Sequence, residues 1–213
     1  MTDTAVGDAR PVDRRARRRQ ETINEILDIA EQVMTEEGVT GLSLAEVARR
    51  LGVQPPSLYK YFGSLTAVYD ALFERGSVRH LEVIRAAMEG VAPGLPALTA
   101  ALDAAGRWSL AHPALAQLLF WRPVPDFEAT PKAMAASVEM VELQRAALHD
   151  AVVAGQLGPG ADDENTVFLL GILISGTLTM AMANDPTVLW DEGRFAPLFR
   201  KAMAVLPALF PPD

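Results

Sequence analysis

The stretch of sequence that decides the fold is Ser43–Leu65, SLAEVARRLGVQPPSLYKYFGSL. Its first half has apolar residues at positions 44, 47, 48 and 51, a spacing that places them on one face of a helix. Gly52 predicts the end of that helix, because glycine readily adopts the left-handed conformation. A second short apolar-periodic segment carries Leu58, Tyr61 and Phe62. Two short helices joined by a tight glycine turn form a helix-turn-helix, whose second helix can enter a DNA major groove.

The residues at the ends of these two helices fit the same interpretation. Ser43 is a good N-cap, and Glu46, three positions later, predicts a capping box in which each residue bonds the other's backbone. Pro55 and Pro56 suit the first turn of the second helix, where their missing N–H groups cost nothing. The second helix is therefore expected over about residues 54–61.

The extended stretch LSLAEVARRLGVQPPSLYKYFGSLTAVYDAL resembles the DNA-binding region of the tetracycline-repressor (TetR) family. The resemblance covers about residues 17–72 and includes an Arg-rich arm and a helix ending in EEGVTGLS. It implies an all-α fold, with an N-terminal three-helix DNA-binding domain followed by a larger helical bundle for ligand binding and dimerisation. We expect a disordered Arg-rich arm over residues 1–16, the helix-turn-helix domain over 17–63, and the effector-binding and dimerisation domain over 64–213.

Composition limits the alternatives. The 213 residues include no cysteine, which excludes disulfides, thiolate metal sites and a cysteine nucleophile. The three histidines, at positions 80, 112 and 149, share no metal-binding spacing, so we expect neither a metal nor a cofactor. The N-terminus has no apolar segment of the kind found in secretory signals, and we expect a cytoplasmic location, as in a bacterial regulator.

The net charge of −8 at first argues against a nucleic-acid partner, but the distribution of charge matters more than its sum. Residues 1–65 contain nine basic and ten acidic side chains, whereas residues 66–213 contain ten and seventeen. Six arginines lie within residues 10–19, directly before the helix-turn-helix. A basic run of this kind is commonly a solvated tail, but in this position it predicts phosphate or minor-groove contacts.

Helical periodicity continues along the whole chain, and no strand pattern or internal repeat stands out. Further helices are expected over residues 14–37, 64–88, 96–111, 113–120, 131–154, 162–184 and 194–209. The segment GQLGPG at 155–160 contains glycines, but no strand precedes it, so it is a turn rather than a phosphate-binding loop.

The helix expected over residues 162–184 contains a nearly continuous apolar run, VFLLGILISGTLTMAMA. The run is slightly short for a membrane span and holds Ser175, Thr177 and Thr179. A helix that is apolar on every side can instead pack against its own domain on one face and a partner on the other. Gly171 and Ser175 are small enough for close helix approach. We expect a homodimer through helices 162–184 and 194–209, and no membrane.

The second helix of the motif offers polar side chains for reading DNA. Gln54, Ser57 and Lys60 are candidates for base or phosphate contacts, since a glutamine amide can pair with adenine. Resemblance to the family places phosphate contacts at Ser43, Tyr59 and Tyr61, although Tyr61 also fits an apolar position of the motif. The full set of candidate DNA-binding residues for a double-stranded operator is Arg17, Arg18, Ser43, Gln54, Pro55, Ser57, Tyr59, Lys60 and Tyr61.

One position departs from the family pattern. Many relatives carry a phosphate-binding lysine where this chain has Leu65. A leucine cannot bind a phosphate in that way, so this anchor is missing or is replaced by the Arg-rich arm.

The C-terminal part is far larger than dimerisation requires, and the resemblance implies a small-molecule effector. The large apolar side chains favour a hydrophobic ligand, although each of them is also a plain candidate for the core. The candidate ligand-binding residues are Trp108, His112, Phe120, Trp121, Met134 and Phe168.

The leading hypothesis is a homodimeric repressor of a palindromic operator, released by a small apolar effector. A transcriptional activator or a ligand-independent regulator remains an alternative, because activation or repression depends on operator position. An enzyme in the helical domain is disfavoured by the lack of a G-x-S-x-G motif and of a His/acid cluster at metal spacing. A third possibility is an interaction module whose basic arm binds an acidic partner.

Overall fold

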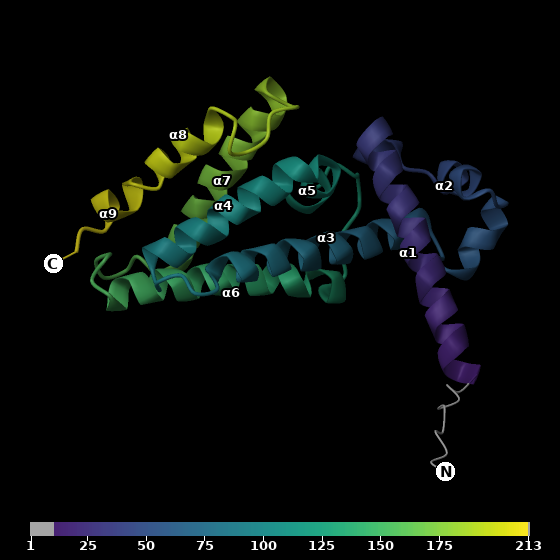
Figure 1. Cartoon of the computed structure of the whole chain (residues 1–213), viewed down its shortest axis with the longest axis horizontal. Coiled ribbons are helices and arrows are strands. Elements are labelled where there is room, and N and C mark those ends of the chain that lie inside the picture. The colour runs from purple at the N-terminus through teal and green to yellow at the C-terminus, as the bar shows by residue number, and fades with distance from the viewer. Residues whose placement is uncertain (1–10, 213) are drawn as a thin grey trace, which may run out of the picture. The chain divides into compact units, whose positions relative to one another are not determined.

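The computed structural model describes residues 11–212 and divides into two compact units, with the boundary between Val68 and Tyr69. Within the described residues the fold is all-α and contains no strand, as the periodicity predicts (Figure 1). One long helix, α3 (Leu65–Met88), contributes its first residues to the N-terminal unit and the rest to the C-terminal unit.

The N-terminal unit consists of α1 (Pro11–Glu37), the 3₁₀ turn η1 (Val39–Gly41), α2 (Leu44–Leu51), the 3₁₀ segment η2 (Pro55–Lys60) and the start of α3. Helix α1 packs against η1 and α2, and α2 packs against η2. Helix α1 begins at position 11 instead of 14, where a proline suits the first turn. Residues 11–16 are therefore helical, and the rest of the predicted arm, residues 1–10, lies outside the described part of the chain.

The apolar stripe of α1 forms the core of this unit with the motif's own apolar residues. Its members come from three segments that are close in sequence, and all are buried: Ile26, Leu27, Ala30, Val33, Met34, Val47, Ala48, Leu58 and Phe62. Burying a side chain such as Leu58 stabilises the fold by about 1.5–3 kcal/mol. The core therefore fixes η2 against α1 and α2 and leaves the polar side of η2 free.

The C-terminal unit contains the remainder of α3 and six further helices. These are α4 (Leu95–Ala111), α5 (Pro113–Phe120), α6 (Pro131–Val153), α7 (Glu164–Asn184), α8 (Phe195–Ala202) and α9 (Val205–Leu209). The bounds of α3 to α7 lie within two residues of those expected from the sequence.

The last helix was expected to be continuous over residues 194–209, and this prediction is wrong. The structure breaks it at Met203 and Ala204, between α8 and α9. Pro207 explains the break, because it has no N–H to bond the carbonyl of Met203 and its ring crowds that carbonyl. The chain closes the gap with a tighter bond from the N–H of Leu206 to the same carbonyl, at 3.2 Å.

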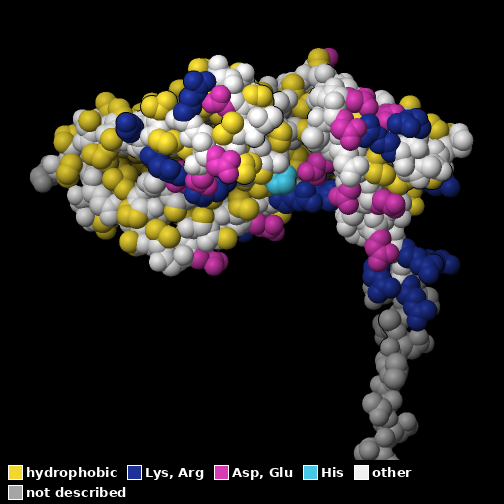
Figure 2. Space-filling model, turned by 45° about the horizontal axis from the view of Figure 1, so that its top comes forward, with side chains coloured by type: hydrophobic (Ala, Val, Ile, Leu, Met, Phe, Trp, Pro, Cys, Tyr) yellow, Lys and Arg dark blue, Asp and Glu magenta, His cyan; other side chains and the backbone are white. Residues whose placement is uncertain are grey.

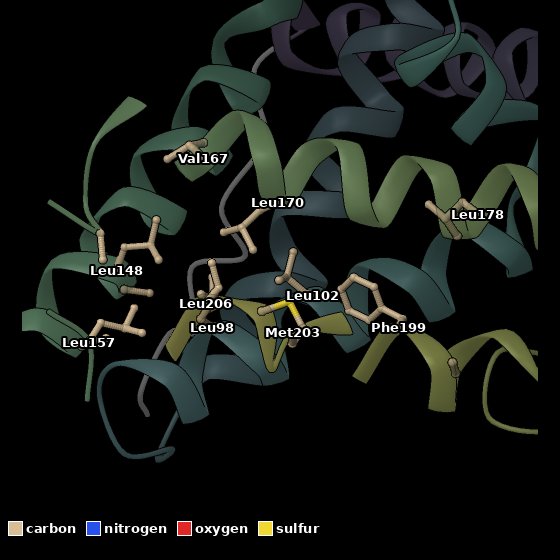
Figure 3. Close-up of a cluster of buried hydrophobic side chains, with 14 of the residues drawn as sticks. Leu98, Leu102, Leu148, Leu157, Val167, Leu170, Leu178, Phe199, Met203 and Leu206 are labelled. Carbon is tan, nitrogen blue, oxygen red and sulfur yellow. The ribbon is translucent and has the colours of Figure 1, made fainter. Parts of the chain in front are cut away.

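The main core of the C-terminal unit lies between α4, α6, α7 and α8. Figure 3 shows Leu170 and Leu178 of α7 in one cluster with Phe199 and Met203 from the α8 region and with Leu102 of α4. Helix α7 packs against α4, α6 and α8. One face of α7 is therefore fixed within its own unit.

Trp190, in the connection between α7 and α8, anchors that connection on α4. Its ring is buried, and its Nε1–H donates a hydrogen bond to Asp103 Oδ1 at 3.1 Å. The contact requires glycine at position 106, because a Cβ on Gly106 would lie 2.6 Å from Cε2 of the indole. Arg200 pairs with the same aspartate at 2.9 Å, so α8 is tied to α4 at the same point.

Candidate nucleic-acid interface and effector cavity

The turn of the helix-turn-helix has the geometry that its sequence predicts. The Ser43 Oγ accepts a hydrogen bond from the backbone N–H of Glu46 at 3.2 Å and so caps α2. Gly52 ends the helix in the left-handed conformation, with φ 71° and ψ 26°. The next residue, Val53, donates its N–H to the Ala48 carbonyl at 3.0 Å. These local bonds fix the direction in which η2 leaves α2.

The second half of the predicted capping box does not form. The Glu46 carboxylate bonds the side chains of Arg49 and Arg50, each at 2.6 Å, and Arg50 also reaches Glu36 at 2.7 Å and Glu37 at 2.9 Å. Two guanidinium groups outcompete a single backbone N–H for the carboxylate, since hydrogen bonds between charged groups are stronger. The capping-box prediction is therefore wrong in this half.

These contacts alter the acidity of the cluster. Hydrogen bonds from Arg49, and then from Arg50, lower the pKa of Glu46 from 4.5 to about 2. The pKa of Arg50 is raised by its bonds to Glu46 and Glu36. The two arginines that precede the turn are thus neutralised by carboxylates of their own unit, which makes them poor candidates for phosphate binding.

The second helix of the motif is a short 3₁₀ segment instead of an α-helix. Pro55 and Pro56 occupy its first positions and supply no N–H, and Ser57 bonds back to the carbonyl of Gln54 at 2.9 Å. Leu58 is buried and holds the segment to the core. Of the predicted reading residues, Gln54, Tyr59 and Lys60 are exposed, whereas Pro55, Ser57 and Tyr61 are half-buried.

The first turns of α1 carry five of the six arginines of the basic run, and Figure 2 shows blue side chains gathered there, whereas Arg10 lies outside the described residues. Arg17 and Arg18 are exposed, and Arg17 approaches Glu21 at 3.5 Å. Arg19, a member of the basic run but not of the set of candidate DNA-binding residues, lies over the ring of Tyr61 at 5.6 Å and donates to the Lys60 carbonyl at 3.5 Å. The basic run is therefore joined to the end of η2 within this unit.

The start of α3 contains Leu65, the position at which the sequence departs from the family pattern. Ser64 caps the helix by accepting the N–H of Ala67 at 3.1 Å. Leu65, the first helical residue, is half-buried and offers no donor to a phosphate. Ser43, in contrast, uses only its oxygen in capping and keeps a hydroxyl hydrogen for donation.

The C-terminal unit contains a cavity of about 320 Å³, which is lined by residues of α3, α4, α5, α6 and α7. This volume lies at the lower end of the range of known small-molecule sites. The lining is mostly apolar, and its charged members, Arg122, Arg145 and Glu164, are not buried. The interior of the cavity therefore suits a small molecule that carries no charge.

The predicted ligand-binding residues divide into two groups. Phe120, Met134 and Phe168 line the cavity. Trp108 and His112 stack on each other at 5.1 Å outside the lining, and Trp121 lies at a separate surface hollow, where its Nε1–H bonds Thr179 at 3.0 Å. Periodicity identifies large apolar residues but does not show which side of a helix faces an internal space.

His80 of α3 lines the cavity and was not among the predicted residues. It is 4% exposed, and its ring lies 4.8 Å from that of Trp108 and 5.4 Å from that of Phe120. Burial lowers the pKa of His80 to about 4, and the Ala105 carbonyl acts in the opposite direction. The imidazole is therefore neutral at pH 7. The only signal in the sequence was a single histidine on an apolar helix face.

The face of α7 turned away from the core is apolar and exposed. Phe168 is 62% exposed and Ile172 is 68% exposed, and the same stripe continues through Gly176, Met180 and Ala183. Among residues 11–212, α7 is also the helix whose length and composition would allow it to cross a bilayer, with 28% of its apolar window buried.

Two family models match this chain. Residues 26–72 match the bacterial regulatory proteins of the tetR family, and residues 98–206, more than half of the chain, match the tetracyclin repressor-like C-terminal domain.

Similar proteins agree with this assignment. The HTH-type regulator Mb1846 of Mycobacterium bovis is 28% identical over 146 residues, which are 68% of this chain and 61% of that protein. YobS of Bacillus subtilis is 41% identical over 51 residues, which are 24% of this chain and 27% of that protein. A solved structure from Rhodococcus sp. RHA1, of unknown function, has a TM-score of 0.73 at 25% identity and covers 88% of this chain and 94% of its own. This chain belongs to the tetracycline-repressor (TetR) family of transcriptional regulators.

Proposed function

We propose that this regulator is a homodimeric repressor that binds a palindromic operator and is released by a small apolar effector. The DNA-binding part of this proposal rests on the structure of η2. Leu58 is buried and fixes this segment, which presents Gln54, Tyr59 and Lys60 to solvent. Gln54 and Ser57 are suited to base edges, while Ser43, Tyr59 and Tyr61 have hydroxyls for phosphates.

Phosphate affinity comes mainly from the first turns of α1. Arg49 and Arg50 are paired with carboxylates, and Leu65 replaces a basic residue, so Lys60 is the main cation of the motif itself. The exposed Arg17 and Arg18 supply the missing positive charge. We expect Arg19 to hold this basic run beside η2 through its contact with Tyr61.

The exposed stripe of α7 supports dimerisation. Phe168, Ile172 and Met180 recur at helical spacing around the small Gly176, and exposed Leu198 lies on α8, which packs against α7. An exposed apolar patch of this kind marks an interaction surface. A second copy of the chain covers it in our proposal, and a bilayer does not, because the opposite face of α7 packs in the core of its own unit.

The cavity supports effector binding. A ligand can release DNA only if it binds the DNA-free conformation more tightly than the DNA-bound one. We place the effector in the 320 Å³ cavity, with Phe120, Met134 and Phe168 in contact with it.

A gel-shift assay on the DNA that flanks its own gene tests the proposal. We expect a specific shift, and footprinting should protect two half-sites about one helical turn, or a multiple, apart, because dimer symmetry is mirrored in the operator. Protection of one asymmetric half-site would count against the dimer. Failure to shift any fragment, together with turnover of a substrate, would replace the proposal by an enzymatic function.

The salt dependence of operator affinity tests the role of the basic run. In Arg17→Ala/Arg18→Ala, the slope of log affinity against log salt should become shallower by roughly 0.9 for each phosphate that is no longer neutralised. The control, Lys132→Ala/Lys201→Ala, removes the same charge from the C-terminal unit and should leave the slope unchanged. Equal slopes for both double variants would exclude the basic run from the interface.

A further inference from the structure

Among the buried polar side-chain atoms of the cavity wall, one has no hydrogen-bond partner. The Ser109 hydroxyl donates to the Ala105 carbonyl at 2.7 Å, and the hydroxyls of Ser77 and Ser137 share a hydrogen bond of 3.1 Å. Nε2 of His80 is buried and has no hydrogen-bond partner. A buried polar atom without a partner is costly and is rare in folded proteins, so it calls for a partner that the chain does not supply.

The other ring nitrogen determines what that partner must be. Nδ1 of His80 lies 3.0 Å from the Sδ of Met140, and a thioether sulfur can only accept a hydrogen bond. We therefore assign the hydrogen of the neutral ring to Nδ1, which leaves Nε2 with a lone pair. The Ala105 carbonyl lies near the His80 ring but already accepts the Ser109 hydroxyl at 2.7 Å, and it makes no hydrogen bond with Nε2, so this assignment leaves the carbonyl satisfied. Nε2 is an acceptor that lacks a donor.

The surroundings of this acceptor define the rest of the ligand. Phe120 packs edge-on against the imidazole and lines the cavity together with Phe73 and Phe168. Nε2 is shielded from solvent. Because Phe120 is 39% exposed, the Phe120 ring can turn and so give a ligand access to Nε2. The charged side chains of the lining lie outside the buried interior.

We propose that the cavity takes an uncharged aromatic molecule that carries a hydroxyl or N–H group, and that this group donates its hydrogen to Nε2 of His80. The proposal rests on the effector role of the cavity proposed above and adds the chemical class of the effector. Aromatic rings of the ligand would pack among the phenylalanines, and the single donor would fix its orientation.

Matched probes test the proposal on the full chain without DNA. Isothermal titration is carried out with 2-naphthol, with 2-methoxynaphthalene, which has the same ring system but no donor, and with 2-naphthoate, which is charged and has no donor. We expect 2-naphthol to bind roughly three- to tenfold more tightly than the ether, the range that one neutral hydrogen bond provides. The carboxylate should bind more weakly than either.

Variants then test whether His80 causes the preference for 2-naphthol over its ether. His80→Phe keeps the ring and removes the acceptor, so the ratio of the naphthol and ether affinities should fall to about one. His80→Gln keeps an acceptor at a similar distance and should retain part of the preference. The matched control is His112→Phe, the same substitution at a ring that also stacks on Trp108 but lies outside the cavity lining, and it should keep the wild-type ratio.

Each result decides the proposal. Equal affinities of 2-naphthol and its ether in the wild type, tighter binding of the carboxylate, or no binding of any probe would overturn it. A preference that survives in His80→Phe would also overturn it, and if that variant does not fold, the wild-type ratios and His80→Gln still decide. Operator release is measured separately. DNA that stays bound when 2-naphthol saturates the protein counts against effector release alone.

Discussion

The two units of this protein differ in how completely their polar groups are paired and their apolar groups are buried within the unit. In the N-terminal unit the charged groups near the motif are paired with each other, as Glu46 is with Arg49 and Arg50, and the apolar groups are buried in one small core. The C-terminal unit leaves an apolar stripe exposed on α7, a cavity inside, and a buried histidine nitrogen without a partner. The buried groups of the first unit are satisfied within it, whereas in our proposal other molecules cover the apolar stripe and fill the cavity of the second. The following predictions test that contrast.

The largest effect is expected in the core of the C-terminal unit. Trp190→Ala should reduce the free energy of unfolding by about 3–5 kcal/mol, because it empties a large buried volume and removes the bond to Asp103. The matched control is Trp121→Ala at a half-buried surface position, which should cost clearly less. All three tryptophans lie in this unit, so tryptophan fluorescence during denaturation measures it selectively, with Trp108 as the reporter in both variants. Equal losses would show that Trp190 is not a special anchor.

The next effect concerns the exposed stripe. Ile172→Arg should convert the proposed dimer to a monomer and weaken operator binding by about a hundredfold, because two linked half-site contacts would become single ones. Val153→Arg introduces the same charge at a site that is 74% exposed at the end of α6, off the stripe, and should leave both properties unchanged. Sedimentation and gel shift provide the measurements. A variant at position 172 that stays dimeric would remove the stripe from the interface.

A smaller effect is expected in the turn of the N-terminal unit. Gly52→Ala should destabilise this unit by about 1–2 kcal/mol, since the φ of 71° is unfavourable for a residue with a Cβ. Gly63→Ala is the matched control in the same unit, because a Cβ there meets nothing within 4 Å and its φ is not in the left-handed region. The change at position 63 should be within about 0.5 kcal/mol of zero. Circular dichroism during thermal unfolding gives both values, and similar losses would refute the conformational argument.

The smallest effect is the contribution of the Glu46 cluster to acid stability. The pKa of Glu46 is lowered on folding, so the carboxylate stabilises the folded state fully above about pH 4.5 and ceases to do so as the pH falls through about 2. Glu46→Gln should therefore flatten the decline in melting temperature over that interval. The side chain is 19% exposed, so added salt should reduce the wild-type effect. An unchanged acid decline in the variant would show that the pairing does not favour folding.

How much of this structure could be predicted depends on how local its determinants are. The cap at Ser43 and the turn at Gly52 are set by neighbours within a few residues, and the structure confirms both. The capping box was wrong because Glu46 meets competing arginines. Apolar periodicity alone predicts one helix over residues 194–209, but the missing N–H of Pro207 breaks it near Met203.

The cavity depends on contacts that are distant in sequence. Phe120, Met134 and Phe168 line it, but equally large residues such as Trp108 do not, and nothing local in the sequence separates the two sets. His80 gains its properties from Met140, which lies 60 residues further along the chain. Only the folded arrangement shows that one of its nitrogens has no partner.

Gly106 and Trp190 form a pair whose sequence identities depend on each other. With the indole in place, any side chain at position 106 would place its Cβ 2.6 Å from a ring carbon. Position 106 can therefore vary only together with position 190. A scan of all double substitutions should show strong epistasis between them, with Gly106→Ala tolerated better when residue 190 is small. The two positions, 84 residues apart, are therefore expected to change together in evolution.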